Sequence, residues 1–180
     1  MARTTPSDAI AGVVVVEPDV HPDARGDFRE TYRASWFPGA PPMVQANLAR
    51  RRAGVVVGLH HHLHQADLWS VAAGRARVVL HDLRRSSPTH GTTLHLDLAA
   101  DGPDARLVYV PPGVAHGFAA LTDVVLTYLV DRTYDPADEW SVAWDDPEVA
   151  ADWGVPSPVV SDRDRSAPRR ASLPPEGVPA

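Results

Sequence analysis

Histidines gather in one short stretch of the chain. His60, His61, His62 and His64 lie within five residues, and Asp67 follows shortly after them. Side chains alternate between the two faces of a strand, so His60 and His62 are expected on one face. A tight turn directly after them would bring Asp67 beside both imidazoles. Two histidines and one carboxylate, with open coordination positions, are typical ligands of non-haem iron and similar divalent metals.

A second segment adds another histidine. Residues 110–118 read as a strand, a Pro/Gly turn and then His116 at the start of the next strand. Together the two segments resemble the two-part motif of the cupin superfamily, which implies a small all-β barrel. The positions that match the metal ligands of that motif are His60, His62, Asp67 and His116. Clustered histidines also occur as solvated turn residues, which is what we expect for His61 and His64.

The elements that must position these residues are short strands. The chain has 18 Pro and 12 Gly, and β-branched runs lie between them. These runs cover residues 13–16, 54–62, 68–71, 76–80, 92–98, 107–110 and 124–130. Many short strands separated by turn signals predict an antiparallel sandwich or small barrel. Regular alternation of strands with helices is missing, which argues against a doubly wound fold.

Two local patterns favour helical structure. Asp146 as a cap, Pro147 in the first turn and Gly154 as a stop signal predict a helix over 146–154. A helical turn is expected over 34–37. From residue 165 the chain is rich in Pro, Arg and Ser, which predicts a flexible tail over 165–180 after a single domain over 1–164.

Composition narrows the chemistry. The 180 residues include 17 basic side chains, all of them Arg, against 23 acidic ones, for a formal net charge of −6. The absence of Lys and Cys excludes lysine Schiff bases, thiolate nucleophiles and disulfide scaffolds. The acidic balance disfavours nucleic-acid binding, and the longest apolar run is too short to cross a membrane. The first residues lack the apolar region of a secretion signal, so a cytoplasmic location is expected.

A longer series of motifs runs in order from about residue 21 to residue 164. The segments are 23–30 (D-x-R-G-x-F-x-E), 45–47 (Q-x-N), 58–60 (G-L-H), 82–91 (D-L-R-x-x-S-P-T-x-G), 111–118 (P-x-G-x-A-H-G-F), 144–147 (W-x-D-P) and 161–164 (S-D-R-D). In this order and spacing the chain resembles the dTDP-4-dehydrorhamnose 3,5-epimerase family. That resemblance implies a cupin-type homodimer that acts on dTDP-4-keto-6-deoxy sugars.

The resemblance also implies residue roles. His60 matches the base that removes a proton next to the C4 ketone, Asp164 the carboxylate that orients it, and Tyr128 the acid on the opposite ring face. The positions that match nucleotide-sugar contacts, some of them across the dimer, are Arg25, Glu30, Gln45, Asn47, His116, Glu139 and Arg163. This chemistry is coherent because a ketone acidifies the neighbouring C–H and histidine titrates near neutral pH.

The chain departs from the family pattern at the same hairpin. Val57 replaces an arginine that contacts the diphosphate, Asp67 replaces a lysine near the C4 oxygen, His62 replaces a glutamine, and the hairpin is shorter. Loss of a preorganised oxyanion stabiliser costs about 3 kcal/mol. Another donor or a divalent cation must therefore take over. A His60 that binds a metal has no free lone pair, so the base and ligand hypotheses compete for this residue.

Three functions follow from these patterns. The first is an epimerase-like enzyme that inverts C3, C5 or both of a dTDP-4-keto-6-deoxyhexose, without a cofactor and as a homodimer. The second is a metal-dependent cupin, an iron oxygenase or a metal-assisted isomerase, holding Fe, Ni or Zn through His60, His62, Asp67 and His116. The third is a barrel that binds a small ligand without catalysis. In each case the partner is a small molecule rather than a nucleic acid or a membrane.

Overall fold

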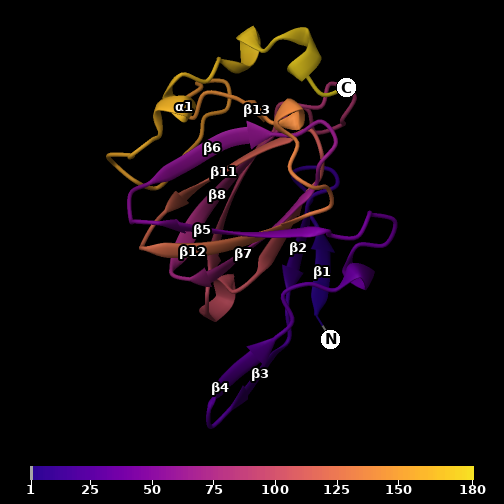
Figure 1. Cartoon of the computed structure of the whole chain (residues 1–180), viewed down its shortest axis with the longest axis vertical. Coiled ribbons are helices and arrows are strands. Elements are labelled where there is room, and N and C mark those ends of the chain that lie inside the picture. Colours follow the sequence, from indigo (N-terminus) through magenta and orange to yellow (C-terminus); the bar gives the residue numbers. More distant parts are fainter. Residues whose placement is uncertain (1) are drawn as a thin grey trace.

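The computed structural model describes residues 2–180, and its body consists of two antiparallel sheets packed face to face (Figure 1). The six-stranded sheet has the order β1 (Arg3–Pro6), β2 (Val14–Glu17), β10 (Leu107–Val110), β7 (Asp67–Ala73), β12 (Val124–Val130) and β5 (Gln45–Arg51). The five-stranded sheet has the order β13 (Trp140–Ser141), β6 (Val56–His61), β11 (Val114–Ala120), β8 (Arg75–Asp82) and β9 (Thr93–Ala99). The expected all-β architecture is confirmed, and each predicted β-branched run forms a strand.

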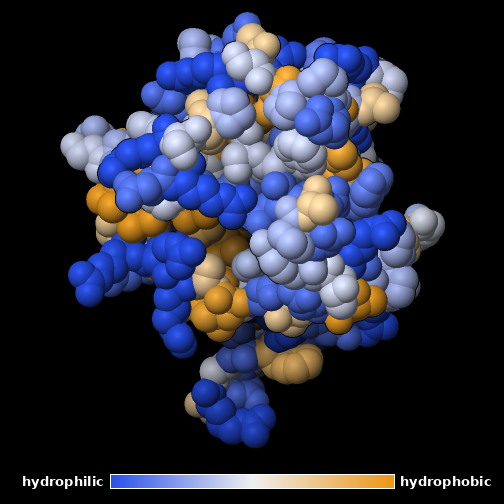
Figure 2. Space-filling view, turned by 45° about the horizontal axis from the view of Figure 1, so that its top comes forward, coloured by the Kyte–Doolittle hydropathy of each residue, from blue (hydrophilic) through white to orange (hydrophobic). Residues whose placement is uncertain are grey.

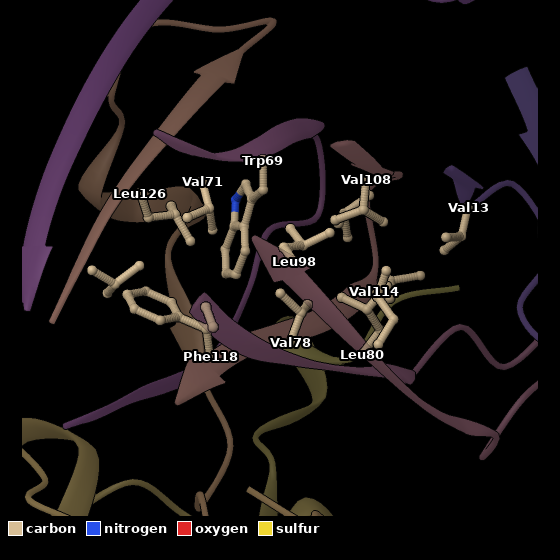
Figure 3. Packing of buried hydrophobic residues seen from close by; sticks show 14 of the residues in the cluster. Val13, Trp69, Val71, Val78, Leu80, Leu98, Val108, Val114, Phe118 and Leu126 are labelled. Atoms are coloured by element: carbon tan, nitrogen blue, oxygen red, sulfur yellow. The ribbon is translucent and has the colours of Figure 1, made fainter. Parts of the chain in front are cut away.

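The core lies between the sheets, where inward residues of both meet (Figure 3). Trp69 of β7 packs edge-on against Phe118 of β11, with ring centroids 5.8 Å apart. Val78, Leu98 and neighbouring aliphatic residues are fully buried around this pair. Each such side chain contributes roughly 1.5–3 kcal/mol of burial free energy. The core therefore fixes the two sheets against each other and holds the inward polar residues in place.

Strands β6 and β11 approach each other unusually closely. His60 of β6 lies directly opposite His116 of β11, and the register shifts between His116 and Phe118. A Cβ on Gly117 would lie 2.6 Å from the Val57 carbonyl oxygen. Only glycine fits there, because real Cβ atoms essentially never come that close. This close approach sets the mutual position of the two histidines.

The prediction of a helix over residues 146–154 is wrong. The segment makes a single turn, in which the Val149 and Ala150 amides both donate to the Asp146 carbonyl, and Ala150 then takes a positive φ of 52°. A residue with positive φ cannot continue a right-handed helix, so the segment that Asp146 caps ends after one turn. The short helix is α1 (Asp162–Arg165), and the helical turn expected over 34–37 is confirmed as the 3-10 helix Ala34–Trp36.

A β-hairpin projects from the body. It consists of β3 (Val20–Asp23) and β4 (Gly26–Arg29), which form a separate two-stranded sheet. Figure 1 shows this hairpin extending below both sheets, and Figure 2 shows the corresponding narrow projection on a mostly hydrophilic face. Phe28 of β4, which pairs with His21 of β3, is 66% exposed.

The C-terminal segment lies over the outer face of the five-stranded sheet (Figure 1). It contains the 3-10 helices Arg170–Ser172 and Pro175–Gly177. The buried His61 ring donates from Nε2 to the Gly177 carbonyl over 2.7 Å, and Gly177 packs against Trp140. His61 therefore lies on the expected opposite face, but the expectation that it is solvated is wrong. The flexible tail expected over residues 165–180 stays a prediction, and deletion of the last residues can test it.

In the part of the chain that the structure describes, no helix has the length and apolar character needed to span a bilayer.

Candidate active site

A histidine–aspartate pair joins β6 of the five-stranded sheet to α1. The Nε2 atom of His60 in β6 is 2.8 Å from Oδ1 of Asp164 in α1. Asp164 is held in turn by the Gly58 amide, which donates to Oδ2 over 3.4 Å, and its own amide donates to the cap residue Ser161 over 3.1 Å. An ionised carboxylate only accepts hydrogen bonds, so Nε2 carries the proton and Nδ1 keeps a lone pair. The pair therefore presents a base.

The carboxylate of this pair is ionised at neutral pH. Burial by itself raises the pKa of Asp164, whose side chain is only 5% exposed, but hydrogen bonding to His60 outweighs burial and leaves the pKa below its usual value. A carboxylate behind an imidazole fixes its tautomer and stabilises the imidazolium that forms when Nδ1 takes a proton. Asp164 is 104 residues from His60 in the chain, and α1 brings it there.

A tyrosine lies on the opposite sheet. Tyr128 of β12 pairs with Asn47 of β5 on one side and with Trp69 of β7 on the other. The Trp69 ring contacts His116, the residue directly opposite His60, at a centroid distance of 5.2 Å. These contacts link the inner faces of the two sheets, so the imidazole of His60 and the phenol of Tyr128 come from different sheets of one interior.

The tyrosine is a protonated donor. Burial raises the pKa of Tyr128 first, and the negative charges of Asp67 and Glu139 raise it further against a small opposing effect of Arg51. Within residues 2–180 its hydroxyl has no hydrogen-bond partner. A phenol that keeps its proton and is unengaged can donate that proton to a bound molecule.

A chain of polar contacts joins four predicted substrate-binding residues. Gln45 donates to Asn47 over 3.0 Å and accepts from the Tyr134 amide over 3.1 Å. The Tyr134 hydroxyl donates to Glu139 over 3.1 Å, and Glu139 pairs with Arg163 over 3.1 Å. Burial raises the pKa of Glu139, but Arg163 and the other partners outweigh it and keep the carboxylate ionised. The sequence motifs did not identify Tyr134, because none of them includes it.

Three of the four predicted metal ligands come together. Ligand atoms of His62, Asp67 and His116 all lie within 4.8 Å of one another, and the three residues are buried. His60 does not belong to this group, and its Nε2 atom is hydrogen-bonded to Asp164. The candidate base and the three candidate ligands that lie together are therefore different residues.

The hairpin between β6 and β7 is fixed by Asp138, which sequence reasoning also missed. Its carboxylate accepts from the Leu63 amide over 2.8 Å and from the His64 amide over 3.2 Å. Its carbonyl accepts from Nδ1 of His62 over 2.9 Å. Asp138 comes from a 3-10 turn far along the chain, Pro136–Asp138, and no spacing rule connects it to the histidines.

Two predicted substrate contacts lie away from this interior. Arg25 pairs with Asp23 at the tip of the projecting hairpin, and its side chain is 90% exposed. Glu30 pairs with Arg33 just beyond the same hairpin. Val57, at the position where the family pattern has an arginine, packs against the core. A single chain therefore brings together the catalytic candidates and most of the binding candidates, but leaves Arg25 and Glu30 apart.

Comparisons with known proteins agree with this geometry. A family model for dTDP-4-dehydrorhamnose 3,5-epimerase matches residues 7–172. The dTDP-4-dehydrorhamnose 3-epimerase of Streptomyces niveus is 39% identical over 166 residues, covering 88% of this chain and 79% of that protein.

Solved structures agree as well. NovW of Streptomyces spheroides, a 4-keto-6-deoxy sugar epimerase from the novobiocin gene cluster, superposes with a TM-score of 0.93 at 35% identity, covering 100% of this chain and 94% of that one. A Legionella pneumophila 3,5-epimerase in complex with dTDP-4-keto-L-rhamnose gives 0.92 at 29% identity, covering 99% and 98%. The predicted cupin-type jelly roll is thereby confirmed, and the chain belongs to the dTDP-4-dehydrorhamnose 3,5-epimerase family.

Proposed function

We propose that this chain is an epimerase that inverts a carbon next to the C4 ketone of a dTDP-4-keto-6-deoxyhexose. The observation that carries the proposal is the pairing of His60 with Asp164 on one sheet and the unengaged hydroxyl of Tyr128 on the other. Sequence relatives include a protein named as a 3-epimerase and others named as 3,5-epimerases, and a solved 3,5-epimerase has the same fold. The same proton chemistry serves either carbon that flanks the ketone.

The reaction needs one proton removed and one returned. Nδ1 of His60 takes the proton from the carbon, and the electron pair of that C–H bond moves into the ketone to give an enolate with negative charge on the C4 oxygen. The Tyr128 hydroxyl then donates its proton to the carbon from the other face, which regenerates the ketone with the centre inverted. Proton exchange with solvent restores both side chains. Only protons move, so this step requires no redox cofactor.

Binding of the nucleotide sugar involves the polar chain described above. Arg163 directly precedes Asp164 in the chain and is paired with Glu139. Gln45 and Asn47 present amide groups beside Tyr128 on the neighbouring strand. We propose that these residues contact the sugar and the nucleotide. A nucleoside diphosphate sugar is too charged to cross a membrane unaided, and we place its conversion in the cytoplasm.

We propose that two chains complete the site as a homodimer. The hairpin of β3 and β4 carries Arg25 outward, and Phe28 on it is exposed. The edge strand β5 also exposes Leu48, at 53%. A dimer that covers these apolar residues would let the hairpin of one chain reach the interior of its partner. Light scattering of the purified protein tests this, because a monomeric mass at micromolar concentration contradicts it.

Deuterium uptake from heavy water tests the epimerase proposal. Incubation of dTDP-4-keto-6-deoxyglucose with the protein in D2O should place deuterium at C3, at C5 or at both, as seen by NMR. The His60→Asn variant is the matched negative, because it keeps the size of the side chain but loses the base. Absence of deuterium at both carbons with the unaltered protein would refute the proposal.

A further inference from the structure

The group formed by His62, Asp67 and His116 is not needed for the proton transfers described above. The three residues are 9%, 3% and 5% exposed. They come from the residue directly after β6, the start of β7 and the middle of β11. The imidazole rings of His62 and His116 lie 5.5 Å apart, and Nε2 of His116 is 3.8 Å from Oδ2 of Asp67. Ligand atoms of all three lie within 4.8 Å of one another.

Both imidazoles are held with the same nitrogen turned inward. Nδ1 of His62 donates to the Asp138 carbonyl over 2.9 Å. Nδ1 of His116 donates to the Val114 carbonyl over 3.0 Å. Because a carbonyl only accepts, each Nδ1 carries the proton and each Nε2 keeps its lone pair. Histidines that bind metals characteristically donate their other ring nitrogen to a carbonyl or carboxylate in this way.

The carboxylate between them is oriented and lacks a strong counter-charge. Oδ1 of Asp67 accepts from the Gln65 amide over 2.9 Å, and Oδ2 accepts from the Trp69 indole over 3.0 Å. Over residues 2–180, no arginine pairs with Asp67, and the chain has no lysine. A buried carboxylate beside two lone-pair nitrogens is expensive unless a cation joins them.

We propose that His62, Asp67 and His116 hold a divalent transition-metal ion. Two imidazole nitrogens and one carboxylate oxygen leave open coordination positions and suit Fe²⁺, Co²⁺, Ni²⁺ or Zn²⁺. His60 does not belong to the group whose ligand atoms lie within 4.8 Å of one another, so it stays available as the proposed base. The site itself stands on the geometry of these side chains.

A role for the ion rests on the proposed function. Proton removal next to the ketone leaves negative charge on the C4 oxygen, and a bound cation supplies positive charge that stabilises such an oxyanion. His116 lies directly opposite the base His60 on the neighbouring strand, which places the ion beside the reacting centre. The site would thus replace the cationic side chain that a lysine-free chain cannot provide.

Metal binding by the untagged full-length protein tests the site. After treatment with a chelator and dialysis, the protein should bind one equivalent of Co²⁺ per chain with visible d–d absorption, and Zn²⁺ should compete for it in calorimetry. Asp67→Asn, which keeps an oxygen for the Trp69 indole, and His62→Ala should each weaken binding at least about 100-fold. His64→Ala is the matched control, because this exposed turn histidine lies two residues from His62 and should bind as the unaltered protein does.

The results separate the site from the reaction. Folding of each variant is checked by circular dichroism. Less than stoichiometric binding by the unaltered protein, or equal binding by Asp67→Asn, overturns the metal site. Deuterium uptake by the metal-free and the Co²⁺-loaded protein is measured in parallel. If the protein binds one equivalent of metal but takes up no deuterium, the metal site is supported and the epimerase proposal is refuted. If it takes up deuterium fully but does not bind metal stoichiometrically, the epimerase proposal is supported and the metal site is refuted.

Discussion

Replacement of Asp164 by Asn probes the charge behind the proposed base. The carboxylate oxygen lies 2.8 Å from Nε2 of His60, and its side chain is 5% exposed. Opposite charges about 4 Å apart interact by about 4 kcal/mol at an effective dielectric constant near 20. Asparagine keeps the size and one accepting oxygen but loses this stabilisation of the imidazolium. At about 1.4 kcal/mol for each factor of ten, the variant should lose roughly 10³-fold in the rate of proton abstraction.

The assay is the initial rate of deuterium uptake from D2O into the 4-keto sugar at saturating substrate. Because Asp164 lies behind His60, we expect kcat to fall while KM changes little. Asp162→Asn is the matched control, since this carboxylate is on the same helix, is fully exposed, and pairs with Arg165 on the protein surface. If Asp164→Asn retains its rate within threefold, or if Asp162→Asn loses as much, the carboxylate does not support the base and the reasoning is wrong.

Three further outcomes concern stability. Gly117→Ala should lower the unfolding free energy measured with urea by about 1–3 kcal/mol, because its Cβ would lie 2.6 Å from the Val57 carbonyl oxygen. An unchanged urea midpoint would show that β6 and β11 can move apart to make room. Burial lowers the pKa of both His61 and His81 to about 4. Between pH 6.5 and 4 the unfolded chain binds protons at these histidines that the folded chain does not, so each histidine should lower the unfolding free energy by about 3 kcal/mol by pH 4. His81→Gln should therefore show a weaker loss of stability on acidification. A variant whose stability falls with pH as steeply as that of the unaltered protein would contradict this. Deletion of residues 174–180 removes the carbonyl partner of His61 and should lower the unfolding free energy by about 1–3 kcal/mol, whereas a free tail would leave it unchanged.

Much of the fold could be predicted because local patterns and packing agree. The run from Val124 to Val130 is rich in β-branched and aliphatic residues, has no Pro or Gly, and forms β12 in the middle of a sheet. Strand alternation also placed His60 and His62 on the inner face and His61 on the outer one. Regular periodicity therefore identifies which face of a strand a side chain occupies.

Contacts between distant segments could not be predicted in this way. His60 is hydrogen-bonded to Asp164, which α1 brings to it, and His62 is oriented by a carbonyl of Asp138. Neither contact has a local signature. The helix expected over 146–154 failed for a related reason: Asp146 caps a turn and also accepts from the Arg170 amide, a contact from the C-terminal segment that a local capping pattern does not reveal.

The proposed reaction depends on His60 and Tyr128 acting on opposite faces of one substrate, inside the interior that the two sheets share. Its most direct test compares deuterium uptake and product configuration for His60→Asn and Tyr128→Phe with the 4-keto sugar in D2O. His60→Asn should abolish both uptake and inversion. Tyr128→Phe should still exchange the proton at the base but lose inversion by about 100-fold or more. Full inversion by Tyr128→Phe, or undiminished uptake by His60→Asn, would contradict the account.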